Sequence, residues 1–159
     1  MPTERKASVL TRLIYIIIQC TWGAPQSLCG LILMLLLGKQ KRGVYRCAVL
    51  TQYSQSTLPR LFRSLASVSL GMFIFVNEGE NPRPEAVRAV VSHEYGHTIQ
   101  SLLLGPLYLP LVGLPSFLWC RRFTKRRASY AARGISYYSR YPEKQATRIG
   151  ERVEKNKSR

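Results

Sequence analysis

Two histidines and a glutamate at helical spacing are the residues of this sequence best suited to chemistry. His93, Glu94 and His97 belong to the run His93-Glu94-Tyr95-Gly96-His97, an H-E-x-x-H pattern, and the chain has only 2 His. Residues i and i+4 lie on one face of an α-helix, so both imidazoles can reach one cation. Glu94 stands beside that face, where it can take a proton from a zinc-bound water and return it to a leaving amine. The pattern predicts a zinc-dependent peptidase site, with His93 and His97 as metal ligands and Glu94 as general base.

A third metal ligand is required, because a catalytic zinc ion takes three protein ligands and one open position. The sequence has no further His and no Asp, so this ligand must be Glu or Cys. Glu143 begins a predicted helix directly after an aromatic run at 137–141, which makes it the best placed of the later glutamates to be packed and dry. We predict Glu143 as the third ligand; the alternative is a glutamate that caps its helix or forms a salt bridge. The other candidates lie before His93 or near the C-terminal end: Glu78, Glu80, Glu85, Glu151 and Glu154.

One helix must position the motif. Pro84 and Glu85 suit a first helical turn, and Gly105 with the following proline predicts an end near residue 105. Tyr95 points off the metal face and is expected to pack, whereas Gly96 allows a neighbouring element to approach closely. The alternative is a pair of helix-surface histidines beside a solvated glutamate.

The charge balance is strongly basic. The chain has 24 Lys and Arg against 8 acidic residues, all Glu, which gives a net charge of +16. Such a balance favours nucleic acid, an anionic membrane or an acidic partner. Two long uncharged apolar stretches favour the membrane, because Lys and Arg gather beside membrane segments on the cytoplasmic side.

The first apolar stretch, residues 13–38, carries no charge and is long enough to span a bilayer. Gly23 and Pro25 interrupt it, which allows a kink or a re-entrant hairpin. We expect a single kinked span, with a hairpin and a buried helix pair of a soluble domain as alternatives. A cleavable signal peptide fits poorly, since the run is too long and is followed by Lys39 and Lys41.

The middle of the chain changes to a strand-like composition. Residues 44–51 and 67–76 are rich in β-branched and aromatic residues, and we predict one strand in each and a short antiparallel sheet. In zinc peptidases of this type a strand beside the cleft commonly pairs with the substrate backbone, so one strand is either a substrate edge or purely structural.

The second apolar stretch ends in the most basic part of the sequence. Residues 101–120 are apolar but contain internal prolines, so we expect an irregular membrane-buried segment or an interfacial helix. Thirteen Lys or Arg against three Glu follow between residues 121 and 159, which favours contact with a membrane surface over a merely solvated tail. Residues 142–153 read as a helix, and residues 154–159 as a disordered tail.

The 4 cysteines show no C-x-x-C spacing. We expect buried reduced thiols instead of disulfides or metal ligands, which fits a reducing compartment.

Five motifs carry a resemblance to a known family: Ser69 to Phe75, His93 to Ser101, Leu104 to Leu109, Gly113 to Ser116 and Tyr141 to Lys144. Together they resemble a group of small, largely uncharacterised bacterial membrane proteins taken to be zinc metallopeptidases. The resemblance covers most of residues 13–150 and implies a zincin-like helix carrying the H-E-x-x-H motif. The group also resembles Glu-zincins in its downstream Pro-Glu-Lys helix; there an acidic residue usually stands four after the Glu, whereas this chain has Thr147.

These observations predict a membrane-associated α+β protein with an N-terminal apolar helix or helical hairpin, a short antiparallel sheet, the motif helix and a basic C-terminal helix. The expected parts are a leader and membrane segment at 1–42, a minimal metallopeptidase-like domain at 43–153 and a tail at 154–159. The expected function is hydrolysis of a peptide or membrane-near protein by one Zn²⁺, at a membrane with the site facing the cytoplasm. The alternative is a non-catalytic membrane adaptor or nucleic-acid-binding protein. Four side chains were equal candidates to stabilise the oxyanion: Tyr137, Tyr138, Arg140 and Tyr141.

Overall fold

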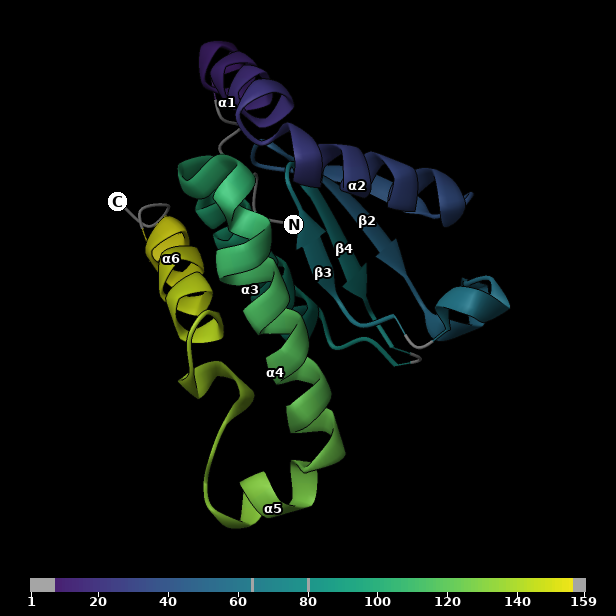
Figure 1. Ribbon diagram of the computed structural model, residues 1–159. Coiled ribbons are helices and arrows are strands. Elements are labelled where there is room, and N and C mark those ends of the chain that lie inside the picture. The colour runs from purple at the N-terminus through teal and green to yellow at the C-terminus, as the bar shows by residue number, and fades with distance from the viewer. Residues whose placement is uncertain (1–7, 64, 80, 156–159) are drawn as a thin grey trace.

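The computed structural model describes residues 8–63, 65–79 and 81–155 and has an α+β architecture (Figure 1). Its strands form one mixed sheet in the order β1-β2-β4-β3. The strands are β1 (Lys41–Tyr45), β2 (Ala48–Tyr53), β3 (Val68–Leu70) and β4 (Phe73–Asn77). The α-helices are α1 (Val9–Thr21), α2 (Ala24–Leu36), α3 (Pro84–Leu104), α4 (Leu114–Lys125), α5 (Arg127–Ala132) and α6 (Glu143–Lys155). Short 3-10 helices lie at η1 (Gln55–Thr57), η2 (Arg60–Phe62), η3 (Gly105–Leu107) and η5 (Tyr137–Ser139).

Helices cover both faces of the sheet, and alternating side chains of β4 supply the two cores. Ile74 and Val76 pack with Tyr95 on the α3 side. Phe73 and Phe75 pack on the other side, where partly buried residues of α2 join the cluster. Because successive side chains of a strand point to opposite faces, five residues of β4 are enough to join α3 and α2 through one sheet.

The sheet corrects three predictions from the sequence. Residues 44–51 are not one strand but span a hairpin in which Arg46 adopts a positive φ of 55°. Residues 67–76 likewise turn back at Gly71, where φ is 59° and a Cβ would lie 2.2 Å from Ser27 Oγ. The sheet is also not purely antiparallel, since β2 and β4 run parallel. Residues 54–67 carry the chain past the position of β4 to the edge, so β4 returns between β2 and β3.

The first apolar stretch forms two helices with a sharp elbow in place of the expected single kinked span. Ser8 caps α1, Pro25 lies in the first turn of α2, and the two axes meet at 97°. Among the described residues no single helix has the length and apolarity to cross a membrane. The bent pair α1 and α2 together has that length and apolarity. Gln19 and Gln26 at the elbow are buried and donate hydrogen bonds to α3 and the residue after it: Gln19 to Thr98 O at 3.1 Å, and Gln26 to Ser101 Oγ at 3.0 Å and Gly105 O at 2.9 Å.

The second apolar stretch is irregular, as its prolines predict. The motif helix ends at Leu104, close to its predicted end, because Gly105 takes a positive φ of 53°. A 3-10 turn and a π-helix (Leu109–Gly113, η4) then lead into α4.

The cysteines are free, as predicted, but their expected burial holds only in part. Cys47 is buried and Cys120 partly buried, whereas Cys20 and Cys29 are exposed on α1 and α2. Cys20 and Cys29 are exposed because α1 and α2 turn polar side chains toward the protein interior.

The C-terminal helix α6 lies alongside α3 (Figure 1). It includes Glu154 and Lys155, the first residues of the predicted tail, and residues 156–159 lie outside the described part of the chain.

Candidate metal centre

His93, His97 and Glu143 form a buried group that can hold a metal ion. Their ligand atoms all lie within 4.8 Å of one another. Glu143 Oε2 lies 3.0 Å from His93 Nε2 and 3.4 Å from His97 Nε2. Ligands held about 2.1 Å from a tetrahedral ion lie about 3.4 Å apart, so these separations match a common ion between the three atoms. The C-terminal helix lies against the motif helix, as a third ligand at Glu143 requires.

Two glycines let α6 approach α3 closely enough for Glu143 to reach both imidazoles. A Cβ at Gly96 would lie 2.0 Å from the carbonyl oxygen of Ala146. A Cβ at Gly150 would lie 2.3 Å from the carbonyl oxygen of Ser92. Each glycine thus faces the backbone of the other helix, where any side chain would force the helices apart. The close approach expected at Gly96 is confirmed, and its partner is α6.

Thr147 fixes the protonation pattern of His93. Its hydroxyl donates to the carbonyl oxygen of Glu143 at 3.0 Å, one helical turn earlier. The hydroxyl oxygen of Thr147 also lies 2.9 Å from His93 Nδ1. Because its own hydrogen is already donated to Glu143, it accepts the hydrogen of Nδ1. Nδ1 therefore carries the hydrogen and leaves Nε2 toward the metal position. Thr147 stands four residues after Glu143, where the resemblance expects an acidic residue. Its side chain hydrogen-bonds the ligand His93.

Gln100 plays the same part for His97. Its Oε1 lies 2.7 Å from His97 Nδ1 and can only accept, so Nδ1 again carries the hydrogen. The amide nitrogen of Gln100 donates to Gln145 Oε1 on α6 at 2.8 Å, which holds the amide in this orientation. Both imidazoles therefore direct Nε2 at Glu143.

Glu143 is held at both carboxylate oxygens. Oε2 faces the two imidazoles, and Oε1 accepts a hydrogen bond from Ser116 of α4 at 2.5 Å. Burial opposes ionisation of Glu143, but its contacts with the imidazoles of His93 and His97 outweigh burial and hold the pKa of Glu143 well below its usual range. Burial also lowers the pKa of His97, and the hydrogen bond to Glu143 with the charge of Glu94 outweighs this and raises the pKa overall.

Glu94 is buried beside the group and lines a cleft, with the hydroxyl of Ser69 on β3 near its carboxylate. Burial raises the pKa of Glu94, and the nearby His97 and His93 counteract part of the effect. A buried carboxylate with a raised pKa that lines the cleft can accept a proton from a group bound there.

The cleft beside Glu94 has a volume of about 780 Å³. All three residues of the edge strand β3 line the cleft, and so do Glu94, His97 and Glu143. Apolar residues of η2, of the segment after it and of α4 form much of the rest, with two basic side chains on α4: Leu61, Phe62, Leu65, Leu114, Phe117, Arg121 and Lys125.

The predicted oxyanion candidates separate in space. Tyr137 lines the cleft, and Tyr138 packs edge-on against His93 with ring centroids 4.9 Å apart. Arg140 stacks on Trp119, and the hydroxyl of Tyr141 donates to the carbonyl oxygen of Leu111. Only Tyr137 of the four contacts the cleft.

Of the other glutamates that the structure describes, none but Glu94 lies beside the group. Glu78 accepts a hydrogen bond from Gln52, and Glu154 accepts one from Tyr45. Glu85 and Glu151 are exposed, and Glu80 lies outside the described residues.

Ser116, Gln100 and Tyr108 are site residues that the sequence did not indicate. Gln100 follows His97 by three residues, so helical spacing offered a signal for it. Tyr108 lines the cleft and donates to the carbonyl oxygen of Ser69 at 3.4 Å. Neither Ser116 nor Tyr108 has a local pattern, because each reaches the site through the path of the chain after α3.

Comparison with protein-family models, with curated proteins and with solved structures finds no match for this chain.

Proposed function

We propose that this protein is a zinc metallopeptidase that hydrolyses peptide bonds in the cleft beside His93, His97 and Glu143. The observation that carries the proposal is that a buried three-ligand group and a further buried carboxylate, Glu94, line one cleft. Ligands alone are compatible with a structural metal. The additional carboxylate and the cleft favour catalysis.

The donor set supports zinc. Two imidazole nitrogens and one carboxylate oxygen are a ligand set of catalytic zinc sites, and their supporting hydrogen bonds leave both Nε2 atoms toward the ion. Zinc in this position supplies a water of lowered pKa and a positive charge for the substrate carbonyl.

Glu94 is the proposed general base and later the general acid. Its burial raises the pKa, which brings proton acceptance and proton donation closer to neutral pH. Since Glu94 lines the cleft, the proton lost by the attacking water can move to its carboxylate and then to the leaving amine.

The substrate is proposed to lie along β3. This strand pairs with β4 on one side only among the described strands, and its three residues line the cleft. An extended peptide can add to such an edge by backbone hydrogen bonds. Tyr137, at the same cleft, is the proposed donor to the oxyanion, since burial raises its pKa and keeps the hydroxyl protonated.

The test separates metal binding from turnover. His93→Ala or His97→Ala should abolish zinc binding, and Glu143→Gln should weaken zinc binding and turnover together. Glu94→Gln should keep stoichiometric zinc and should no longer cleave a peptide pool, with the products identified by mass spectrometry. The exposed Glu151→Ala is the matched control and should match the unchanged protein. Retained cleavage in Glu94→Gln would refute the peptidase proposal.

A non-catalytic membrane adaptor or nucleic-acid-binding protein is the competing function. Such a protein has no use for stoichiometric zinc, and affinity for nucleic acid would fall steeply with salt. Zinc analysis of the purified protein together with a salt titration of nucleic-acid binding distinguishes the two.

A further inference from the structure

The two N-terminal helices have their polarity reversed relative to helices on the surface of a water-soluble protein. The most buried residues of the pair are polar: Gln19 and Gln26 are both 0 % exposed. Large apolar residues stand on the outside, and Ile17 and Leu35 are 60 % and 66 % exposed. A surface helix normally buries its apolar stripe and exposes its polar one.

The exposed apolar residues form a continuous stripe on each helix. On α2 they stand at intervals of three and four, which places them on one face. Polar contacts of the opposite face hold the pair to α3, so this outer face is fixed in place. The outer face consists of Leu10, Leu13, Ile14 and Ile17 of α1 and Leu28, Leu31, Ile32 and Leu35 of α2.

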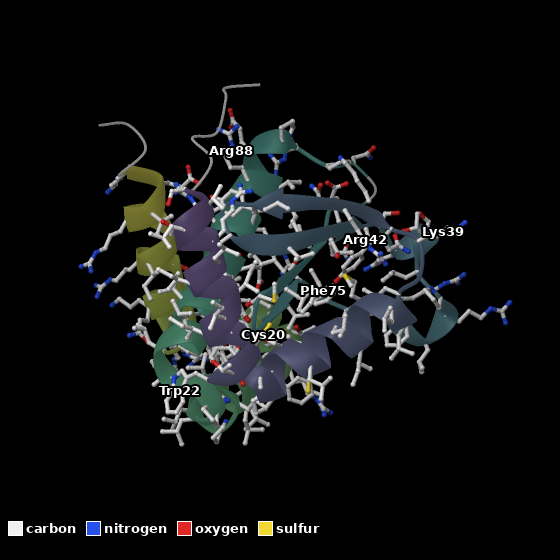
Figure 2. All side chains as sticks on the ribbon, turned by 90° about the horizontal axis from the view of Figure 1, so that it is seen from above. Cys20, Trp22, Lys39, Arg42, Phe75 and Arg88 are labelled. Carbon is white, nitrogen blue, oxygen red and sulfur yellow. The ribbon has the colours of Figure 1, made fainter. Side chains whose placement is uncertain are left out.

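Both helices lie across one side of the molecule, and basic residues flank them. Viewed from above, the V formed by α1 and α2 spreads over the protein, with Arg88 beyond the start of α1 and Lys39 and Arg42 beyond the end of α2 (Figure 2). Lys39 and Arg42 are exposed, and no acidic residue occurs between positions 5 and 77. An apolar surface between basic ends is complementary to an anionic bilayer, whose headgroups attract Lys and Arg while its acyl region takes the apolar side chains.

We propose that the outer face of α1 and α2 docks on an anionic membrane, with both helices lying in the plane of the interface. This places the catalytic domain on the membrane surface and goes beyond the proposed peptidase activity, on which it does not depend. A lipid surface is favoured over a second copy of this chain because two such faces would bring their basic ends together.

Binding is tested with the full chain synthesised in a cell-free system with vesicles and separated by flotation. Vesicles of equimolar phosphatidylcholine and phosphatidylglycerol should carry the protein upward, and phosphatidylcholine vesicles should carry much less. The double variant Lys39→Ala with Lys41→Ala should bind the anionic vesicles less well, by about fivefold for each lysine.

The apolar face is tested with Leu31→Glu combined with Leu35→Glu, which should lower binding by more than about tenfold. The matched control is Leu61→Glu on η2, since Leu61 is 83 % exposed but lies outside both apolar stretches. Equal loss in the control would overturn the assignment of the face. The assignment would also be overturned if every variant bound vesicles as well as the unchanged protein.

Depth is measured by fluorescence of Trp22, which is half-exposed at the elbow, with Trp22→Phe to identify its signal. In-plane docking predicts stronger quenching by lipids brominated near the headgroup than by lipids brominated near the chain end. Stronger quenching by the deep bromines would show that the elbow penetrates the bilayer and would overturn in-plane docking. Dimer formation through this face without vesicle binding, measured by analytical ultracentrifugation, would also overturn the proposal. Zinc content and turnover play no part in these readouts, so a failure here is separate from a failure of the peptidase proposal.

Discussion

Individual hydroxyl and amide groups decide how the three candidate ligands are presented. Thr147 accepts from His93 Nδ1 while it donates to the backbone of Glu143, and Ser116 donates to the carboxylate oxygen that does not face the imidazoles. Each contact leaves one ligand atom directed at the shared position. The affinity of the site for metal therefore depends on residues that do not bind it.

Replacing Thr147 by Val removes the acceptor of His93 Nδ1 and keeps the shape of the side chain. We expect zinc affinity to fall by about tenfold or more, measured by competition with a chromophoric chelator. Thr147→Ser retains the hydroxyl and should restore most of the affinity. An affinity in Thr147→Val equal to that of the unchanged protein would show that this hydrogen bond does not orient His93.

The metal-free site also predicts how stability depends on pH. The pKa of His97 is raised by Glu143 and Glu94, so its stabilisation is present below about pH 6.5 and is lost as the pH rises through the higher folded value. The pKa of Glu143 is lowered, so its stabilisation is present above about pH 4.3 and is lost as the pH falls. The raised pKa of Glu94 adds a cost as the pH rises above about 4.3.

The melting temperature of the metal-free protein should therefore fall as the pH rises from mildly acidic to mildly alkaline. The stabilisation that added zinc gives should grow over the same range, because zinc competes with protons for the imidazoles. Calorimetry with chelator and with zinc measures both trends. In His97→Ala the melting temperatures with chelator and with zinc should be the same at each pH. A metal-free protein that becomes more stable above neutral pH would contradict the assignment of His97.

At the scale of elements, the site depends on one close helix pair. The backbones of α3 and α6 approach at Gly96 and Gly150, and this contact sets the reach of Glu143 at the first residue of α6. The opposite face of α3 packs on the sheet, where Tyr95 meets Tyr45 edge-on at 5.5 Å. Because both faces are in contact, α6 cannot be displaced without moving the site.

Gly96→Ala should therefore destabilise the fold by about 1–3 kcal/mol, since the added methyl group overlaps the backbone of Ala146. Zinc affinity should fall as well, because Glu143 moves with α6. Gly43→Ala on β1 is the matched control: a Cβ there meets nothing within 4 Å, and its φ is not positive. Chemical denaturation measures the stability, and an unchanged midpoint for Gly96→Ala would contradict the close contact.

At the scale of the whole molecule, the candidate centre joins three segments that are distant in the sequence. The ligands come from α3 and α6, and Ser116 of α4 supports Glu143. An ion that binds only when these segments are assembled stabilises the entire fold by mass action. Metal binding and folding are therefore expected to be linked throughout the chain.

Zinc at about a hundred times its dissociation constant should stabilise the folded protein by about 2.7 kcal/mol. For a chain of 159 residues this corresponds to a rise in melting temperature of about 5–10 °C. His93→Ala and His97→Ala should melt at the same temperature with and without zinc, whereas Glu94→Gln should keep the shift. A shift that survives in either histidine variant would place the binding site elsewhere.

The sequence by itself determined the features that depend on helical geometry. The spacing of His93 and His97 placed both on one helix face, and Pro84 and Gly105 marked that helix at its two ends. Glu143 followed from elimination among few acidic residues and from its place at a helix start. The placement of the two histidines held because it depends on distances along one helix, which the backbone fixes without regard to the rest of the chain. Glu143 stands on a second helix, and its position beside both imidazoles depends on the packing of α6 against α3.

Only the tertiary structure decided which segments meet and which way they face. Arg46 turns the predicted strand at 44–51 into a hairpin, and the crossing of residues 54–67 makes β2 and β4 parallel. Gln19 and Gln26 find partners on α3 and so turn the apolar side of α1 and α2 outward. Ser116 of α4 reaches Glu143 of α6 in the same way. Contacts between distant segments are selected by packing and hydrogen bonding of the whole fold, so they leave no periodic pattern in the sequence.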